Sequence, residues 1–241
     1  MTTLFISDLH LHASRPAVTE CFLRFLQQNA SSTDTLYILG DLFEAWVGDD
    51  DPDPHNRQVI SALRSFTREV PDCYFVRGNR DVMVGKRFAK ETGIHLLGEV
   101  TKIDLYGQSA LISHGDELCT DDHSYQRYRR VVNHPAGRTF FLSLPLSIRM
   151  WIARKLRSRS KAETPEKPDY ITDVNAEAVA QAFRSWHVTT MIHGHTHRPA
   201  IHELSVDGTP CRRIVLGDWY EQGSVLVCSH AGCELQTLSN G

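Results

Sequence analysis

The chain has 241 residues, with 26 Lys and Arg against 29 Asp and Glu, so its formal net charge is −3. Hydrophobic residues make up 41% of the chain and charged residues 23%, an ordinary globular balance that excludes a disordered chain. This balance also argues against a uniformly basic nucleic-acid-binding protein, although it leaves room for a local basic patch.

Apolar runs rich in β-branched and aromatic residues predict buried strands in the order of the chain. These runs are residues 4–7, 36–39, 73–76, 110–113, 190–192, 213–216 and 225–228. Apolar residues at helical spacing predict helices at 18–28 and 57–66, between the first strands. The alternation predicts an α/β fold, and the closer spacing of the later strands indicates an antiparallel or second sheet.

Residues 121–175 interrupt this alternation, because no convincing strand falls among them. Residues 125–132 and 147–156 have helical patterns, and the polar, Pro-containing stretch 162–169 predicts a loop. We therefore expect a single domain, residues 1–241, that carries a helical insertion at 121–175.

The cysteines and the first residues bear on the cellular compartment. None of the six cysteines forms a C-x-x-C pair, and we expect all six to be reduced thiols: Cys21, Cys73, Cys119, Cys211, Cys228 and Cys233. The first residues, MTTLFISDLHLH, lack a basic segment and a long apolar stretch, and no window approaches about 18 apolar residues. The sequence thus predicts a cytoplasmic protein that meets a membrane, if at all, at its surface.

Short polar motifs follow five of the predicted strands. They are Asp8-Leu9-His10, Gly40-Asp41, Gly78-Asn79-Arg80-Asp81, His114-Gly115-Asp116 and Gly194-His195-Thr196-His197. In open α/β sheets the carboxyl ends of the strands form the ligand-binding crevice, so we expect these motifs to meet there. We call seven of their side chains the strand-end cluster: Asp8, His10, Asp41, Asn79, His114, His195 and His197.

The strand-end cluster offers more donors than one tetrahedral ion accepts. Its oxygen and nitrogen donors, without thiolate, suit two ions that share a bridging carboxylate and favour Mn²⁺, Fe²⁺ or Zn²⁺ over Ca²⁺. Each motif by itself has an ordinary alternative, because Asp-x-His or Gly-Asp after a strand is common turn or helix-cap chemistry. Five such motifs in succession are difficult to explain as turns, and the sequence therefore predicts a two-metal site.

The order D-x-H, G-D, G-N, H-G and G-H-x-H resembles the calcineurin-like metallophosphoesterase family. The resemblance implies a four-layer fold, with two packed sheets flanked by helices. It also implies that one metal takes Asp8, His10 and His197, that the other takes Asn79, His114 and His195, and that Asp41 bridges them.

Arg80 departs from the pattern of many family members, which have a His after Gly-Asn. The sequence therefore offers no obvious His general acid at this point, and an Arg there suits a phosphate oxygen. We expect Asn79 and Arg80 to be the catalytic side chains. The alternative for Arg80 is a surface ion pair with Asp81.

A closer resemblance covers the whole chain and concerns a branch of this family that acts in lipid A biosynthesis. It is carried by LYILGDLFEAWVGDDDP, GKRFA, HGDELCTDD and IHGHTHRP. It implies two Mn²⁺ ions, with Fe²⁺, Zn²⁺ and Mg²⁺ left open, and water attack on the α-phosphorus of a uridine-diphosphate sugar that carries two acyl chains. Implied substrate contacts are Asn79, Arg80, Asp122, Ser160, Thr164, Lys167 and His195; for Ser160 and Lys167 the alternative is a solvated loop.

Residues 149–161 contain six basic side chains and no acidic one, and apolar residues including Trp151 share one helical face. A basic amphipathic helix with Trp is typical of a membrane surface, whereas the alternative is a helix packed on the core with a solvated basic face. With an acylated substrate, we expect peripheral binding to the cytoplasmic face of the inner membrane. We expect neither a nucleic-acid partner nor an obligate protein partner.

Other functions remain as alternatives. The same scaffold serves a pyrophosphatase or phosphodiesterase of a soluble nucleotide, which has little need for a basic amphipathic helix. A non-catalytic scaffold is expected to lose ligands, yet all seven positions are filled. A nuclease is also compatible with the metals, but no long basic stretch with interleaved aromatic residues appears.

Overall fold

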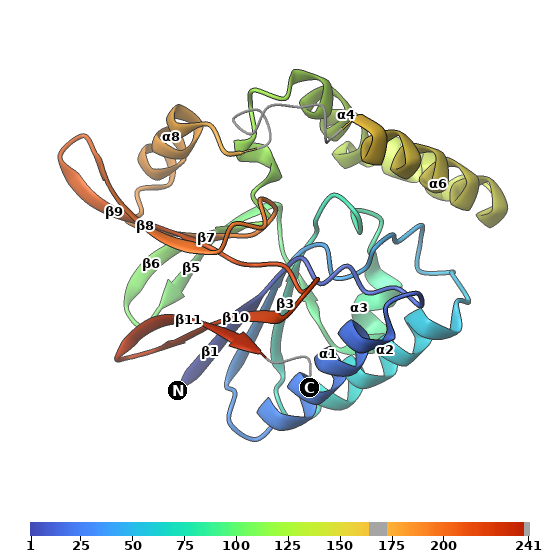
Figure 1. Cartoon of the computed structure of the whole chain (residues 1–241), viewed down its shortest axis with the longest axis horizontal. Helices are drawn as coiled ribbons and strands as arrows, with labels where there is room; N and C mark the ends of the chain where they lie inside the picture. The colour runs from blue at the N-terminus through green and yellow to red at the C-terminus, as the bar shows by residue number, and fades with distance from the viewer. Residues whose placement is uncertain (164–172, 239–241) are drawn as a thin grey trace.

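The computed structural model describes residues 1–163 and 173–238, with only the backbone described for 159–163. Its first sheet has the strand order β11-β10-β1-β2-β3-β4 (Figure 1). Strands β1 to β4 run parallel to one another, whereas β10 is antiparallel to both β1 and β11. The bounds are β1 Thr2–Ile6, β2 Thr35–Leu39, β3 Asp72–Val76, β4 His95–Leu96, β10 Gly223–Ser229 and β11 Gly232–Leu238.

The second sheet has the order β5-β6-β7-β9-β8, in which β6, β7 and β9 are parallel. Its edge strands β5 and β8 are each antiparallel to their neighbour. The bounds are β5 Val100–Leu105, β6 Gln108–Ser113, β7 Thr190–His193, β8 Ala200–Val206 and β9 Thr209–Val215. The expected second sheet is thus confirmed.

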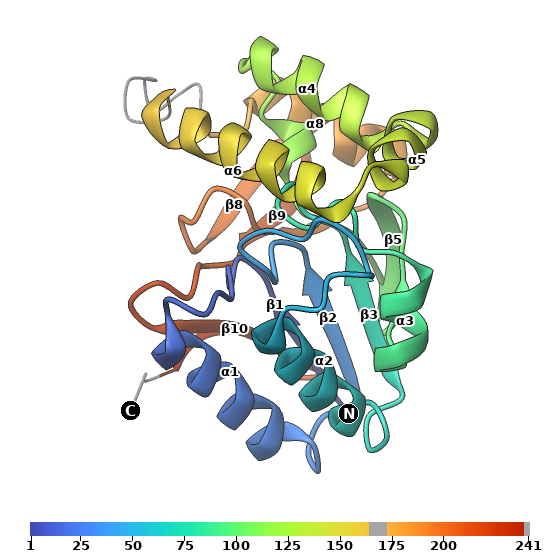
Figure 2. The ribbon, with the colours of Figure 1, turned by 90° about the vertical axis from the view of Figure 1, so that its right-hand side faces the viewer.

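Helices cover the outer faces of the two sheets. Figures 1 and 2 show α1 (Pro16–Asn29), α2 (Pro54–Phe66) and α3 (Lys86–Thr92) against the first sheet. Helix α8 (Ala176–Trp186) packs through Val179 and Phe183 on the second sheet. The order of layers is helix, sheet, sheet, helix, which confirms the predicted four-layer α/β fold.

Three apolar clusters fill the three spaces between the layers. In β1, Leu4 and Ile6 belong to the cluster beneath α1 and α2, whereas Phe5 belongs to the cluster between the sheets. This alternation follows from the period of two in a strand, and the same pattern recurs in β2 and β3. Because both faces are covered, these strands are apolar throughout, which made them recognisable in the sequence.

The described part of residues 121–175 is helical, without a strand. It contains α4 (His123–Asn133), α5 (Pro135–Ser143) and α6 (Leu146–Glu163), which we call the cap helices. Figures 1 and 2 show the cap helices above the ends of both sheets. The predicted loop at 162–169 is wrong at its start, because α6 continues to Glu163; its residues 164–169 lie outside the described residues.

Two basic residues of α6, Arg149 and Arg157, are directed at the body of the protein. Arg149 is only 3% exposed and donates hydrogen bonds to the carbonyls of Val47 (2.6 Å) and Leu144 (2.9 Å). It also pairs with Asp50, and Arg157 pairs with Glu44. These residues therefore fasten α6 to the loop after β2, and the alternative of a solvated basic face does not hold for them.

The expectation of six reduced cysteines is wrong for two of them, because Cys228 and Cys233 form a disulfide. They are directly opposite each other in the β10–β11 hairpin, where the register pairs them across the two strands. The spacing of these two cysteines is not C-x-x-C, and the exposed strand β11 carries no apolar run that would mark the hairpin in the sequence. The other four are buried thiols: Cys21, Cys73, Cys119 and Cys211.

Candidate metal centre

The five predicted motifs meet at one edge of the two sheets. The amides of Asp8 and His10, after β1, donate to the carbonyls of Gly40 (3.1 Å) and Asp41 (2.9 Å), after β2. In the second sheet, Gly194 N donates to His114 O at 2.9 Å. Main-chain hydrogen bonds between the segments that follow neighbouring strands thus hold the motifs in register. The side chains of all five motifs reach one site.

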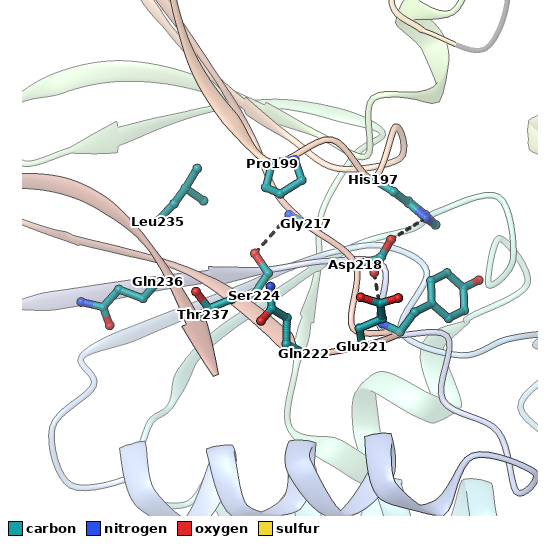
Figure 3. A pocket seen from close by; sticks show the side chains of 11 residues that line it. His197, Pro199, Gly217, Asp218, Glu221, Gln222, Ser224, Leu235, Gln236 and Thr237 are labelled. Atoms are coloured by element: carbon teal, nitrogen blue, oxygen red, sulfur yellow. Dashed lines mark hydrogen bonds and ion pairs between the residues drawn. The ribbon is translucent and has the colours of Figure 1, made fainter. Parts of the chain in front are cut away.

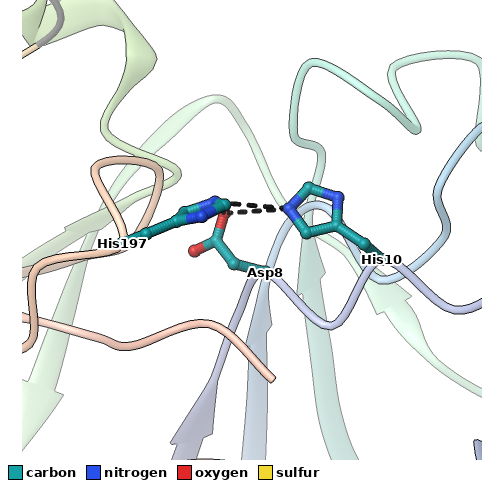
Figure 4. Close-up of side chains that lie close together, drawn as sticks. All are labelled: Asp8, His10 and His197. Carbon is teal, nitrogen blue, oxygen red and sulfur yellow. Dashed lines mark hydrogen bonds and ion pairs between the residues drawn. The ribbon is translucent and has the colours of Figure 1, made fainter. Parts of the chain in front are cut away.

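Asp8, His10 and His197 form the first half of the site (Figure 4). The Nε2 atoms of His10 and His197 are 3.3 Å apart, and His197 Nε2 lies 3.3 Å from Asp8 Oδ1. The other oxygen of Asp8 accepts hydrogen bonds from Ser7 Oγ (2.6 Å) and His195 N (2.9 Å). One carboxylate oxygen is therefore held by the protein while the other faces two imidazoles.

The second half lies around His114. Its Nδ1 donates to Leu39 O at 2.9 Å, which directs Nε2 into the site. From there, His114 Nε2 is 3.1 Å from Asn79 Oδ1 and 3.2 Å from His195 Nδ1. Asn79, His114 and His195 thus converge as the resemblance implied.

Asp41 lies between the two halves. Its Oδ2 is 3.9 Å from His10 Nδ1, and its Oδ1 is 3.7 Å from His114 Nε2. Asp41 is 2% exposed, and its Oδ1 also accepts a hydrogen bond from the main-chain amide of Arg80 at 2.8 Å. Asp41 thus faces a histidine ring of each half, and Asp8 likewise belongs to both groups of candidate ligand atoms.

The backbone of this site is strained. Five members of the strand-end cluster have positive φ: Asp8 (57°), His10 (49°), Asp41 (53°), His195 (71°) and His197 (54°). Positive φ is unfavourable for residues with a Cβ and accumulates at functional sites. The main chain at Gly78 and Gly194 lies so close to Asp41 and Asp8, respectively, that a Cβ would overlap their carboxylates. Glycine at these two positions therefore lets the turns pack directly against the carboxylates of Asp41 and Asp8.

The charges of the strand-end cluster are strongly coupled. Burial raises the pKa of Asp41 to about 7, with a further rise from Asp81 and Asp8. Burial opposes a charge on His114, but Asp41 and Asp8 raise its pKa to about 9. Burial and the neighbouring His114 lower the pKa of His195 to about 3. Without metal, protons on some of the imidazoles therefore compensate the buried carboxylates.

Two buried atoms of the site, Asp8 Oδ1 and His10 Nδ1, have no hydrogen-bond partner among the described residues. Such orphaned acceptors are costly unless a cation or another donor satisfies them. The carboxylate and imidazole atoms of each group, Asp8, His10 and His197 or Asp8, Asp41 and His114, lie within 4.8 Å of one another. With the two orphaned atoms, these donors fit a divalent metal.

The expected alternative for Arg80, an ion pair with Asp81, is not formed. Asp81 is fully buried, and it accepts hydrogen bonds from the amides of Leu42 and Gly78, both at 2.8 Å. Arg80 Nε is buried without a hydrogen-bond partner among the described residues. Arg80 therefore contacts the site through its main-chain amide, which donates to Asp41. Its side chain makes no ion pair with Asp81.

The remaining predicted substrate contacts are only partly described. Asp122 caps α4, since its carboxylate accepts hydrogen bonds from Tyr125 N (3.1 Å) and Ser124 Oγ (2.7 Å). Ser160 lies in α6, but its side chain is outside the described part of the structure, as are Thr164 and Lys167 entirely. Their role in substrate binding stays a prediction.

Three residues of the site were missed in the sequence. Asp218 Oδ2 is 3.1 Å from His197 Nδ1, and the Tyr220 ring stacks on His10 with centroids 5.4 Å apart. Tyr125 of α4 stacks on His195, with centroids 6.0 Å apart, and donates to Asp116 at 2.6 Å. Asp218 and Tyr220 follow a strand end, in the sequence LGDWY, and that Gly-Asp was the available signal.

Comparisons with known proteins assign the chain to a family. Residues 1–199 match the model of the calcineurin-like phosphoesterase family. A Serratia proteamaculans protein named UDP-2,3-diacylglucosamine hydrolase is 52% identical, and a Klebsiella pneumoniae protein of the same name is 51% identical; each alignment covers 98% of both chains.

Solved structures resemble the chain in fold. Zinc-bound Vps29 of Entamoeba histolytica superposes with a TM-score of 0.50 and 14% identity over the full length of both chains. At this identity the likeness concerns the fold alone. By its sequence and its fold, the chain belongs to the calcineurin-like phosphoesterase family, in the group of the UDP-2,3-diacylglucosamine hydrolases.

Proposed function

We propose that this protein is a metal-dependent hydrolase that cleaves the pyrophosphate bond of UDP-2,3-diacylglucosamine. The products are UMP and 2,3-diacylglucosamine 1-phosphate (lipid X), an intermediate of lipid A biosynthesis. The observation that carries the proposal is the strand-end cluster, in which two carboxylates, an amide and four imidazoles converge at the sheet edge. The identity of the substrate is inferred from the relatives at about 50% identity, which are named UDP-2,3-diacylglucosamine hydrolase.

The residues of the cluster fit two Mn²⁺ ions. Asp8, His10 and His197 are the proposed ligands of one ion, Asn79, His114 and His195 those of the other, and Asp41 the bridge. Fe²⁺, Zn²⁺ and Mg²⁺ accept the same donors. When bound, such ions lower the pKa of a water toward about 7 and so make hydroxide available at neutral pH.

The protein's own groups act on the pyrophosphate. Water attacks the α-phosphorus in line, its oxygen leaves with UMP, and the sugar 1-phosphate departs with the bridging oxygen. Arg80 and Asn79 are the proposed catalytic side chains: Arg80 offsets the charge that develops on the phosphoryl oxygens, and Asn79 also contacts the phosphate. A phosphate leaving group needs little protonation, which is consistent with Arg rather than His at position 80.

The lipid half of the substrate belongs, in this proposal, to the cap at residues 121–175. The proposed substrate contacts in the cap are Asp122, Ser160, Thr164 and Lys167. Those outside it are Asn79, Arg80 and His195. The cap helices carry large exposed apolar side chains: Tyr128, Val131, Phe140, Leu142, Ile148, Met150, Trp151 and Leu156. Exposed apolar side chains gathered on three successive helices suit acyl chains or a lipid surface.

We further propose peripheral binding at the cytoplasmic face of the inner membrane through this apolar surface. Among the described helices, none is long and apolar enough to cross a bilayer. Arg154 and Lys155 of α6 lie beside the apolar residues, and Lys155 Nζ is 5.1 Å from the Trp151 ring centroid. The electrostatic attraction is weaker than the sequence indicated, because Arg149 and Arg157 are held by Asp50 and Glu44.

Hydrolysis in ¹⁸O-labelled water tests the reaction. The label is expected in UMP and not in lipid X. Label in lipid X would indicate that water attacks the β-phosphorus instead. The alternative function, hydrolysis of a soluble nucleotide, predicts equal turnover of UDP-N-acetylglucosamine. A strong preference for the diacylated substrate would reject that alternative.

Vesicle sedimentation tests the membrane proposal. Binding is expected to rise with the fraction of anionic lipid, to fall with salt, and to weaken in Trp151→Ser. Trp186→Ser, on exposed α8 away from the cap helices, is the matched control. Equal loss of binding in both variants, or none in Trp151→Ser, would contradict the role of the cap.

A further inference from the structure

A pocket of about 530 Å³ begins at His197 and extends along β10 and β11 to the segment that follows β9 (Figure 3). This volume is within the range of small-molecule sites. Beyond His197, the pocket is lined by Pro199, Gly217, Asp218, Tyr220, Glu221, Gln222, Ser224, Leu235, Gln236 and Thr237. The described lining contains carboxylates, amides and hydroxyls but neither Lys nor Arg.

The wall of this pocket is rigid and connected to the strand-end cluster. Trp219 is fully buried; its amide donates to Asp8 O at 3.2 Å, and its indole Nε1 donates to Ser224 O at 3.1 Å. Ser224 Oγ in turn accepts a hydrogen bond from Gly217 N at 3.2 Å. The segment between β9 and β10 is thus fixed at both the metal site and the sheet, so the pocket is preformed.

The two halves of the strand-end cluster face different parts of the molecule. At His195 the cluster meets α4, through the stacked ring of Tyr125. At His197 it opens into the pocket beside β10 and β11. Figures 1 and 2 show the cap helices and the β10–β11 hairpin on different sides of the sheet ends. A substrate that is cleaved between two phosphates on the cluster must extend in two directions from it.

We infer that this pocket binds the nucleoside half of the substrate, an inference that rests on the proposed function. The acylated sugar matches the exposed apolar residues of the cap helices, which leaves the pocket for uridine. Carboxylates such as Glu221 accept hydrogen bonds from ribose hydroxyls, as acidic residues do in dinucleotide sites. An amide such as that of Gln222 has both the donor and the acceptor that the uracil edge requires.

The charge of the pocket supports the same assignment. A phosphate in this lining would meet carboxylates and no Lys or Arg, and the pairing of charges would be unfavourable. An uncharged nucleoside meets no such cost. The phosphates therefore stay on the strand-end cluster while the base and ribose occupy the pocket.

Inhibition by the two products tests the inference. Thr237 lies beside Ser224 in the β10–β11 register, whereas Glu234 is on the opposite face of β11. Thr237→Trp is expected to weaken inhibition by UMP on the order of tenfold and to leave inhibition by lipid X within about twofold. Glu234→Trp, which adds the same indole outside the pocket, is expected to leave both unchanged.

Glu221→Gln provides a second variant that does not change side-chain volume. The wild type is expected to be inhibited several-fold less by 2′,3′-dideoxy-UMP than by UMP, and this difference should shrink in Glu221→Gln. Wild type that fails to hydrolyse UDP-2,3-diacylglucosamine would reject the proposed function. Normal hydrolysis with unaltered UMP inhibition in both variants, or weakened inhibition by lipid X alone, would reject the nucleoside pocket.

Discussion

His197 Nδ1 lies 3.1 Å from Asp218 Oδ2, on the side of the ring that faces away from Asp8. This contact indicates that Nδ1 of His197 carries a proton and donates it in a hydrogen bond to Asp218. The other ring nitrogen, Nε2, faces Asp8 and His10. Burial opposes a charge on His197, but Asp218 and Asp8 raise its pKa to about 10. A carboxylate behind a metal-binding imidazole orients the ring and increases its basicity.

Asp218→Asn is therefore expected to weaken Mn²⁺ binding by about 10- to 100-fold, because the imidazole loses its charged partner. The measurement is activity of the chelated protein as a function of added Mn²⁺. Turnover at saturating Mn²⁺ should largely recover, since the ligands themselves remain.

Asp207→Asn is the matched control, because Asp207 pairs with Arg184 on the surface. Its Mn²⁺ dependence should equal that of the wild type. An unchanged Mn²⁺ dependence in Asp218→Asn, with turnover reduced at every concentration, would contradict a positioning role through His197.

Removal of the metals with a chelator is expected to abolish hydrolysis, and Mn²⁺ should restore it. Metal must displace protons from His114 and His197, whose pKa values without metal are raised to about 9 and 10. Mn²⁺ affinity should accordingly fall as the pH falls, and binding should release protons near neutral pH. A pH-indicator dye in weak buffer measures the protons released on Mn²⁺ binding. Full turnover after demetallation would contradict a metal-dependent mechanism.

Arg80→Ala is expected to reduce turnover by about 100-fold or more, the usual effect of losing one electrostatic stabiliser of the transition state. Metal content should be unchanged, because the amide of residue 80 still donates to Asp41. The test combines steady-state kinetics with elemental analysis. Arg87→Ala, at an exposed pair with Glu91, is the control, and near-normal turnover of Arg80→Ala would remove Arg80 from the catalytic residues.

The buried strands were predictable from sequence because each is an apolar run with both faces covered. Strands β8 and β11 were not, since most of their residues are exposed and no apolar run marks them. Helix α3 was missed for another reason. The carboxylate of Asp49 accepts hydrogen bonds from Arg87 N and Phe88 N, both at 3.0 Å, so the helix is capped from a distant loop.

The convergence of the strand-end cluster was predictable because each of its residues lies in a short motif after a recognisable strand. Asp218 and Tyr220 also follow a strand end, but Gly-Asp alone is ordinary turn chemistry. They reach His197 and His10 only because β9 pairs with β7, a register that local sequence does not specify. Residues that support the ligands therefore required the three-dimensional structure.

His193, at the end of β7, gives a prediction for stability against pH. Burial and Arg213 lower its pKa from 6.5 to about 4. Its Nδ1 donates to Gly194 O at 2.9 Å, and its Nε2 accepts a hydrogen bond from Arg213 Nη1 at 3.2 Å, so the neutral tautomer is required. Above pH 6.5 the neutral form is present in both the folded and the unfolded chain.

Between pH 6.5 and about 4 the unfolded chain binds this proton and the folded protein does not. His193 therefore contributes a loss of stability as the pH falls, of at most about 3 kcal/mol. In His193→Asn the decline of the free energy of unfolding over this range should be shallower than in the wild type. Urea unfolding of the metal-free proteins at several pH values measures this decline, with His187→Asn on the surface as the control. Parallel declines in all three proteins would show that His193 titrates normally.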